Sequence, residues 1–530
     1  MKNIFLAMLL IMSGLHITAQ NEDWHHEDPK KDKIIGVSTE EAYKFLKKKK
    51  RTSTKVVVAI IDSGVDVEHE DLKDNIWVNE DEIPGNGIDD DNNGYVDDVH
   101  GWNFLGGEDG KNVENENLEV TRLLRKGQKY FEGKDVSNLS ASDKAEYEKY
   151  KKIKADFEKQ LVDIQENKEG VENLGKNLEA ATRILQNALN KEDFTKEEVM
   201  ALKPANQLEQ QAQAFMNFLY GNNLSAKDIE GMAEYYHDRS AYHLNPEFDP
   251  REIIGDDPSN PVDTLYGNND VIGGDPTHGT HVAGIVGAVR TNDKGVKGIA
   301  DNVSLMVIRT VPNGDERDKD VANAIRYAVN NGAQIINMSF GKPYSPMESI
   351  VDDAIAYASA NRVLMVHGSG NDAENNDEVD NFPNEDFGKG ENPHWINVGA
   401  NDAKKDASLP ATFSNYGKIS VDIFAPGVDV SSTLPKSTYG ENDGTSMASP
   451  VVAGVTALVM SYFPELTPEE VREAVRSALT TPPVTLRSAK GTTLAGALGS
   501  SDGTLTDTSA RLVAELRTAS RTSSGVSSGK

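Results

Sequence analysis

The chain has 530 residues, of which 37% are hydrophobic and 26% are charged, and its formal net charge at pH 7 is −30. This length allows more than one domain, and the strong negative charge argues against nucleic acid or an anionic membrane surface as a partner. The sequence contains no cysteine, which excludes disulfides, thiolate catalysis and cysteine-based metal sites.

The first 19 residues have the pattern of a secretory signal peptide. Lys2 supplies a positive charge, an apolar run extends from Ile4 to Leu15, and Ala19 precedes the expected cleavage site. We therefore expect an exported protein, released by cleavage near Ala19. No other stretch has about 18 consecutive apolar residues, so we expect no membrane span. Residues 20–54 are predicted to form a short polar N-terminal segment with one helix.

An apolar run from Val56 to Ile61 predicts a buried β-strand, and its composition favours a strand of a parallel sheet. The strand ends in Asp62, and Gly64 follows as a turn residue. Open α/β sheets form their sites at the carboxyl ends of strands, so Asp62 is a candidate site residue.

Residues 86–98 form an acidic loop in which oxygen-bearing groups recur at every second position. The candidate ligands are Asp89, Asp91, Asn93, Tyr95 (through its carbonyl) and Asp97. Such spacing wraps a chain around a hard cation, and Ca²⁺ takes about six to eight oxygens. The loop lacks the final glutamate of a full EF-hand, since His100 stands in its place. The pattern predicts a Ca²⁺ site, with an acidic surface turn as the alternative.

Residues 105–270 differ in character from their surroundings. Apolar residues recur at helical spacing between Tyr150 and Ala188, with charged residues between them. The pattern predicts either one long amphipathic helix or a helical hairpin broken near Gly170. A second helix is expected at Asn206–Tyr220. We interpret 105–270 as a mainly helical insertion. It is either a packing ornament, or a lid or inserted domain that gates a site or replaces a pro-domain.

The stretch Thr277–Gly287 is predicted to be a loop that runs into a helix of small residues, and it carries His278 and His281. Residues 271–481 as a whole alternate strands with helices, which is typical of a parallel sheet. The expected strands are Ser304–Val311, Ile335–Met338, Val363–His367, Ile396–Val398 and Ile419–Ala425. The expected helices are Asp318–Asn330, Ser349–Ser359, Pro450–Tyr462 and Pro468–Leu479.

A glycine-flanked turn at Asn442–Pro450 delivers Ser446 to the start of the long apolar helix. Backbone N–H groups and the helix dipole favour negative charge at such a place, which suits a nucleophile that must form an oxyanion beside itself. The alternative is a serine that only caps the helix, because serine is a preferred N-cap residue.

These stretches together resemble the subtilisin-like serine protease family (subtilases). The resemblance rests on Asp62 in I-I-D-S-G-V, His278 in H-G-T-H-V-A-G and Ser446 in G-T-S-M-A-S-P, in the Asp…His…Ser order for which subtilisin is the known example. It implies a three-layer, doubly wound, mostly parallel α/β catalytic domain formed by residues 55–104 and 271–481. The insertion then lies between the catalytic aspartate and histidine.

The resemblance assigns a role to each of these residues. Ser446 is the expected nucleophile, and His278 is the base that takes its proton and later gives it to the leaving amine. Asp62 is expected to hold the imidazole and to stabilise its charged form. His281 is the rival base, and we expect it only to pack against the sheet. Asn371, after an apolar strand, is expected to donate its side-chain amide to the oxyanion.

The resemblance also implies a peptide-binding edge and a structural ion. The residues expected to contact an extended peptide are Ser339, Phe340, Gly341, Gly368, Ser369 and Gly370. The expected substrates are peptides or unfolded proteins, recognised mainly through their backbone. Subtilases are commonly stabilised by calcium, and no catalytic cofactor is expected.

Two features depart from the family pattern and leave the function open. The segment 20–54 is short for an inhibitory pro-domain, and residues 482–530 are expected to be a flexible tail rich in serine, threonine and glycine. We expect a monomeric, exported endopeptidase. The alternative is a catalytically silent or tightly gated relative that only binds peptides.

Overall fold

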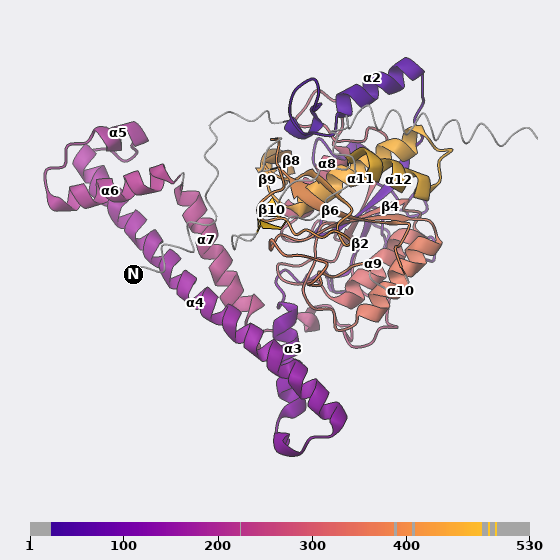
Figure 1. Ribbon diagram of the computed structural model, residues 1–530, viewed down its shortest axis with the longest axis horizontal. Helices are drawn as coiled ribbons and strands as arrows, with labels where there is room; N and C mark the ends of the chain where they lie inside the picture. The colour runs from indigo at the N-terminus through magenta and orange to yellow at the C-terminus, as the bar shows by residue number, and fades with distance from the viewer. Residues whose placement is uncertain are drawn as a thin grey trace, which may run out of the picture. The chain divides into compact units, whose positions relative to one another are not determined.

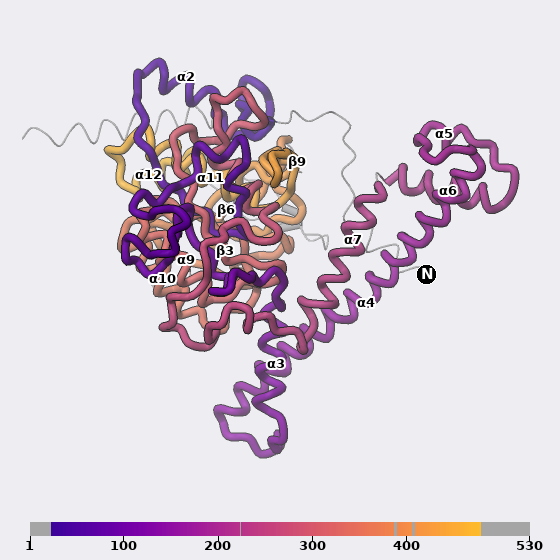
Figure 2. The backbone as a smooth tube through the Cα atoms, turned by 180° about the vertical axis from the view of Figure 1, so that it is seen from behind, coloured from indigo at the N-terminus to yellow at the C-terminus, as the bar shows by residue number. Residues whose placement is uncertain are grey.

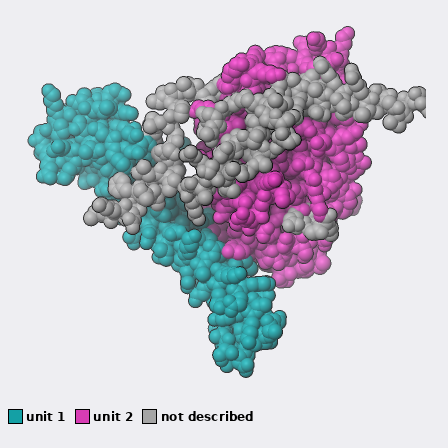
Figure 3. Space-filling model, in the orientation of Figure 1, with its two compact units in different colours: residues 1–19, 120–249 teal, residues 20–119, 250–530 magenta. Residues whose placement is uncertain are grey.

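A computed structural model describes residues 23–222, 224–385, 390–404 and 409–479, together with residues 486–487 and 493–494. The expected signal peptide and most of the tail 482–530 lie outside these residues. Within them, the chain divides into two compact units, and the described part of the smaller one is 120–249 (Figure 3). The larger unit, 20–119 and 250–530, contains the sheet.

The larger unit is built on a seven-stranded sheet in the order β2-β3-β1-β4-β5-β6-β7, in which every pairing is parallel (Figure 1). The strands are β1 (Val56–Asp62), β2 (Gly101–Asn103), β3 (Val303–Arg309), β4 (Ile335–Met338), β5 (Leu364–Gly368), β6 (Trp395–Asn401) and β7 (Ile423–Pro426). This confirms the mostly parallel α/β sheet.

Helices cover both faces of the sheet, because alternate side chains of each strand enter different cores. Val58 and Ile60 of β1 belong to the core on one face, and Ala59 and Ile61 to the core on the other. The first core includes residues of α2 (Thr39–Lys49), α8 (Thr277–Gly287), α11 (Thr445–Tyr462) and α12 (Pro468–Leu479). The second includes residues of α9 (Asp318–Asn330) and α10 (Glu348–Ala360). The result is three layers.

Two small antiparallel pairs complete the larger unit. The first joins β8 (Val430–Leu434) to β9 (Thr438–Asn442), and the second joins β10 (Leu486–Arg487) to β11 (Thr493–Leu494). The first pair was not predicted. Its turn places Lys436 and Ser437 at positive φ, which a tight hairpin needs. Asn-Gly pairs usually signal this conformation, and the turn has neither residue.

The regular secondary structure in the described residues of the smaller unit is helical. Its helices are α3 (Glu119–Phe131), α4 (Ala141–Leu189), α5 (Lys196–Ala201), α6 (Gln207–Gly221) and α7 (Ala226–Asp238), followed by a π-helical turn at Arg239–His243. The two views in Figures 1 and 2 show α7 running beside α4, against which α6 also packs. Of the two predicted alternatives, the long helix is confirmed and the hairpin broken near Gly170 is wrong, because α4 is continuous through this residue.

A few short helical turns connect these elements. They lie at Trp24–His26, Lys73–Asn75, Val136–Asn138 and Arg251–Ile253. Among the described residues, α11 is the one helix long and apolar enough to cross a membrane, but 83% of it is buried inside the protein. Its apolar composition is therefore that of a core helix.

Candidate active site

The candidate site lies where the strand order reverses. β1 lies between β3 and β4, with β2 and β3 on one side of it and β4 to β7 on the other. Open α/β sheets bind ligands outside the carboxyl ends of their strands at such a point. Asp62 ends β1, Ser339 follows β4 and Asn371 follows β5.

Asp62 and His278 are in direct contact. His278 lies in the first turn of α8, and its Nδ1 is 2.7 Å from Asp62 Oδ1. The same carboxylate oxygen accepts the N–H of Ser63 at 2.8 Å. The Asp62 side chain is 1% exposed whereas that of His278 is 41% exposed, so the other ring nitrogen of the histidine remains available for chemistry.

The environment of His278 favours its charged form, while that of His281 does not. Burial disfavours the imidazolium of His278, but the charge and the hydrogen bond of Asp62, with a smaller contribution from Asp275, raise its pKa overall. His281 is fully buried with Nε2 3.2 Å from the Gly440 carbonyl, and burial lowers its pKa to about 4. His278 is thus the histidine placed to exchange protons at neutral pH.

Ser446 lies in the first turn of α11, held by reciprocal hydrogen bonds with Ser339. Its Oγ donates to the Ser339 carbonyl at 3.0 Å, and Ser339 Oγ donates to the Ser446 carbonyl at 2.9 Å. Pro450 has no N–H, so it leaves the Ser446 carbonyl without its usual helical donor. The expectation that the helix begins at Pro450 is wrong, because helical geometry begins at Thr445, directly after Gly444 at φ 146°.

Among the described residues, no hydrogen bond joins Ser446 to His278. The serine hydroxyl instead uses its proton on the Ser339 carbonyl. Catalytic hydrogen bonds are often long or absent without substrate and form in the complex. A rotation about the Cα–Cβ bond of Ser446 would release the hydroxyl from Ser339.

Asn371 is fixed beside the start of α11. Its Oδ1 accepts the Thr445 N–H at 2.9 Å and the Thr445 hydroxyl at 3.1 Å. Because the oxygen is occupied in this way, the Nδ2 donor is the end of the amide that stays available. Nδ2 lies 3.6 Å from the place that a Cβ on Gly444 would take, close to Ser446.

The residues expected to contact the peptide lie around the same helix start. The Gly370 N–H donates to Thr445 Oγ1 at 3.2 Å, and a Cβ on Gly368 would be 3.1 Å from the Thr445 carbonyl. Ser369 is buried, and its carbonyl accepts amide groups of Asn376 and Asn381.

On the opposite side, the Phe340 carbonyl is 2.8 Å from Nε2 of His367. His367 is buried, and burial lowers its pKa to about 4. This histidine therefore ties the segment after β4 to the end of β5. Gly341 next to Phe340 has no recorded backbone hydrogen bond within the described part of the chain.

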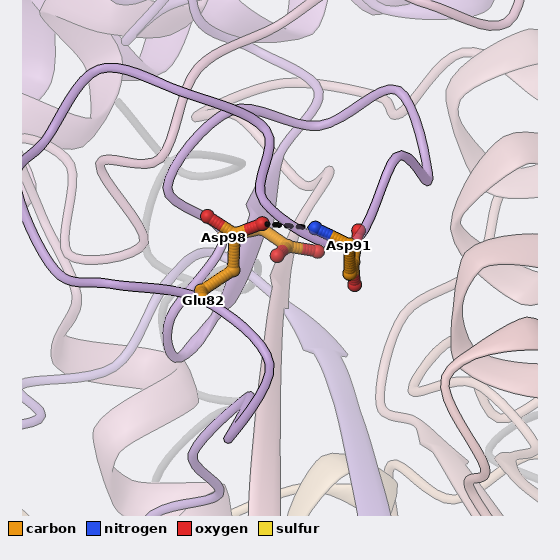
Figure 4. A group of neighbouring side chains, drawn as sticks. All are labelled: Glu82, Asp91 and Asp98. Atoms are coloured by element: carbon orange, nitrogen blue, oxygen red, sulfur yellow. Dashed lines mark hydrogen bonds between the residues drawn. The ribbon is translucent and has the colours of Figure 1, made fainter.

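Two carboxylates of the acidic loop, Asp91 and Asp98, lie close to Glu82, which precedes the loop. One oxygen from each of Glu82, Asp91 and Asp98 lies within 4.8 Å of the others (Figure 4). The Asp91 N–H donates to Glu82 Oε1 at 3.4 Å. Burial, with a contribution from the charge of Asp91, raises the pKa of Asp98 to about 6 despite hydrogen bonds from neighbouring groups. Buried, crowded carboxylates of this kind fit a hard cation.

Only Asp91 of the five predicted ligands belongs to this group. Both carboxylate oxygens of Asp89 accept backbone N–H groups, from Asn93 and Gly94. Those of Asp97 accept backbone N–H groups of residues 85–87. The loop therefore uses these side chains to fix its own turns. Glu82 and Asp98 lie outside the alternating pattern, which is why the sequence analysis did not select them.

Buried ion pairs join the two ends of the insertion to the start of α9, and the sequence analysis did not identify them. Lys342 Nζ contacts Glu119 at 2.9 Å and Asp318 at 2.7 Å. Arg251 contacts Asp320 at 2.7 Å, in a pair with exposures of 5% and 0%. The charged run at residues 317–320 was the available sign of these ion pairs, but a helix start exposed to solvent has the same kind of sequence.

The chain is similar in sequence to a known protein family and to several of its members. A model of the Subtilase family matches residues 53–499. Subtilisin DY from Bacillus licheniformis is 37% identical over 205 residues, covering 38% of this chain and 70% of that protein. The Thermophilic serine proteinase of Bacillus sp. (strain AK1) is 36% identical over 226 residues, covering 42% of this chain and 51% of that protein.

Two solved structures are similar to parts of the chain. A cold adapted subtilisin-like serine proteinase is 28% identical, with a TM-score of 0.34, covering 43% of this chain and 76% of that one. The prenylagaramide maturation protease PagA is also 28% identical, with a TM-score of 0.34, covering 45% of this chain and 82% of that one.

Proposed function

The chain belongs to the subtilase family of serine endopeptidases, and from this premise we propose that it hydrolyses peptide bonds with Ser446, His278 and Asp62. The observation that carries the proposal is the 2.7 Å contact between His278 Nδ1 and Asp62 Oδ1 at the carboxyl end of β1. The reaction class needs a serine hydroxyl, a base and a residue that orients the base.

The first half of the reaction transfers the acyl group to Ser446. His278 Nε2 accepts the hydroxyl proton as Oγ leaves the Ser339 carbonyl and attacks the substrate carbonyl carbon. The tetrahedral intermediate collapses when the protonated His278 gives this proton to the leaving amine, and the C–N bond breaks. Asp62 stabilises the imidazolium throughout. Water then repeats the sequence and releases the acid.

Two donors are available for the oxyanion. The Ser446 N–H is in the first turn of α11 and has no recorded acceptor in the described part of the chain, as expected for a helix start. The second donor is Asn371 Nδ2, which Thr445 orients by holding Oδ1. Preorganised donors of this kind stabilise charge without having to rearrange during the reaction.

We propose that an extended peptide binds alongside Gly341. The N–H and the carbonyl of Lys342 both form hydrogen bonds with the Phe382 backbone. In an extended segment, the N–H and the carbonyl of the neighbouring Gly341 therefore point the other way. A substrate strand could pair with them, and Ser339, Phe340 and Gly368–Gly370 would then line the site near the scissile bond. Recognition through the backbone would accept peptides of varied sequence.

Calcium is the proposed structural ion, held by Glu82, Asp91 and Asp98. Bound Ca²⁺ would neutralise the crowded carboxylates and fix the acidic loop, which precedes β2. Of the residues first selected, Asp91 stays in the ligand set, and Asp89, Asn93, Tyr95 and Asp97 would shape the loop around it. No step of the reaction uses this ion.

Export after cleavage near Ala19 and a monomeric state remain proposals based on the sequence. The second candidate function is a gated or silent peptide binder. The hydrogen bond from Ser446 to Ser339, in place of one to His278, is the observation that favours it.

Casein hydrolysis at neutral to alkaline pH with calcium tests the two candidates. The active enzyme predicts hydrolysis that disappears in Ser446→Ala and after treatment with a sulfonyl fluoride. A folded wild-type protein that binds casein but does not cleave it would support the silent binder.

A further inference from the structure

Arg309 is a buried arginine beside the candidate catalytic acid. It ends β3, it is the register partner of Asp62 on β1, and it is 2% exposed. Its Nε donates to the Ser63 carbonyl at 3.0 Å, within the turn that follows Asp62. Its Nη2 donates to the Val113 carbonyl at 3.0 Å, in the chain that leads into the insertion. One guanidinium thus joins the catalytic turn to the outgoing end of the insertion.

Glu114 connects this arginine to the returning end of the insertion. Its Oε2 accepts Arg309 Nη2 at 3.0 Å and the Gly274 N–H at 3.0 Å. Gly274 lies four residues before His278 in the chain. The Glu114 carbonyl also accepts the Asn313 N–H at 2.8 Å. A single residue therefore contacts both ends of the insertion and the segment that follows β3.

The returning end fits closely against these groups. A Cβ on Gly273, which has φ 68°, would be 2.2 Å from Arg309 Nε, and one on Gly274 would be 2.3 Å from Glu114 Oε2. A Cβ on Gly64 would be 2.3 Å from the Ile272 carbonyl. Real side chains do not approach so closely, so these glycines allow the loop before His278 to lie directly on Arg309 and on the turn after Asp62.

The charges around Arg309 are complementary. Burial lowers the pKa of Arg309, while the carboxylates of Glu114, Asp270 and Asp275 oppose this change. The guanidinium stays charged in proteins, so these acids compensate a permanent buried cation. Glu114 is the one among them that is hydrogen-bonded to it, and its side chain is 42% exposed.

We propose that Glu114 and Arg309 are positioning residues that hold the loop before His278 in register with Asp62. This inference rests on the proposed proteolytic function. Catalysis needs the base within hydrogen-bond distance of both Asp62 and the nucleophile, and a misplacement of about 1 Å can reduce the rate on the order of 100-fold. The two ends of the insertion would therefore be part of the catalytic framework.

The test compares Glu114→Ala and Glu114→Gln with the control Asp109→Ala. Asp109 is in the same stretch, exposed, and paired only with the exposed Lys111. We expect Glu114→Ala to lower kcat by about 10- to 100-fold with KM within about twofold. Glu114→Gln should recover most of the rate, because its amide oxygen can accept both hydrogen bonds. Asp109→Ala should match the wild type.

Two outcomes would overturn the inference. The first is a Glu114→Ala variant with the kcat of the control. The second is a Glu114→Gln variant as slow as Glu114→Ala, which would point to a charge effect rather than to positioning. Since Glu114 is partly exposed, its truncation leaves the core intact, and thermal unfolding of each variant should verify this before the rates are compared.

An NMR measurement separates this inference from the proposed function. The low-field proton resonance of the His278–Asp62 hydrogen bond should be present in the wild type and in Glu114→Gln, and broadened in Glu114→Ala. If the wild-type protein hydrolyses no peptide, the proposed function fails, but this comparison still decides whether Glu114 positions the pair. Equal resonances in all variants would overturn the positioning role.

Discussion

The ends of the insertion and its helical part differ in how they are built. The ends, near residues 105–119 and 250–274, are held by buried charges and by hydrogen bonds to the sheet. The helical unit 120–249 has its own small apolar core and a long helix, α4, whose ion pairs are exposed. A segment that is inserted in the sequence can thus be part of the catalytic unit at its ends.

The difference changes where the insertion should be divided from the catalytic domain. Composition places the boundary at residues 105 and 270, whereas the compact unit spans 120–249. A deletion of residues 110–260 would remove Glu114, Glu119 and Arg251 together with the helices. We propose 120–249 as the separable part.

The largest expected effect concerns the buried ion pairs at the returning end. Arg251→Ala would remove the guanidinium that pairs with Asp320, while Asp256 would keep its contact with Lys319, and both carboxylates are fully buried. Breaking a buried pair typically costs about 3–5 kcal/mol of unfolding free energy. Denaturant unfolding would measure it, with Lys149→Ala on α4 as the control, since exposed pairs contribute about 0–1 kcal/mol. Equal losses of unfolding free energy in the two variants would show that the ends of the insertion are held no more strongly than the exposed surface of α4.

A comparable effect on the rate is expected at the oxyanion donor. Asn371→Ala should lower kcat on the order of 100- to 1,000-fold with little change in KM, because the amide acts on charge that develops in the transition state. Steady-state kinetics on a peptide anilide would measure this. Asn375→Ala, in the same loop but outside the site, is the control, and equal rates in the two variants would remove Asn371 from the mechanism.

The acidic loop predicts a pH-dependent effect of calcium. Burial raises the pKa of Asp98 from 3.8 to about 6, so the Asp98 carboxylate binds a proton more tightly in the folded protein than in the unfolded chain. In calcium-free protein, Asp98 therefore lowers stability as the pH rises from about 4 to 6, by no more than about 3 kcal/mol since one pKa unit is about 1.4 kcal/mol.

Thermal unfolding with calcium or with a chelator measures this prediction. The stabilisation by calcium should grow as the pH rises through 6, and Asp98→Asn should remove most of that growth. A calcium effect that is the same in Asp98→Asn and in the wild type would show that Glu82, Asp91 and Asp98 do not bind the ion.

The smallest expected effect is that of removing the helical unit. Replacing residues 120–249 by a Gly/Ser linker of about ten residues should change kcat/KM on short peptides by less than about threefold, because the buried ion pairs of the ends are kept. Assays on short peptides and on casein would measure this. A large gain on casein alone would indicate that the helical unit gates large substrates, and a general loss would show that it supports the site.

The sequence predicted the framework of the site well, because each element there has a strong local signal. The apolar run before Asp62 and the small-residue helix after His278 identify their elements directly. What it could not predict depends on contacts between distant parts of the chain. The Ser446–Ser339 hydrogen bonds join residues 107 positions apart, and the Arg309–Glu114 pair joins residues 195 apart.

The errors at element boundaries have a similar cause. Proline is common in the first turn of a helix, so the presence of Pro450 led to a predicted start of α11 that is too late. The true start depends on Asn371 and Ser339, which hold the first turn from outside. Of the two forms predicted around Gly170, the broken hairpin does not occur, because a single glycine weakens a helix by only about 1 kcal/mol and α4 continues through it.

The most direct test of the central claim is covalent labelling of the intact protein by a fluorophosphonate, with peptide mass spectrometry to locate the adduct. The account predicts one modified residue, Ser446, with labelling that is lost in Ser446→Ala and His278→Ala and that increases with pH as His278 loses its proton. Because the pKa of His278 is raised, the midpoint should lie above 6.5. Labelling at another serine, or hydrolysis of casein by Ser446→Ala, would contradict it.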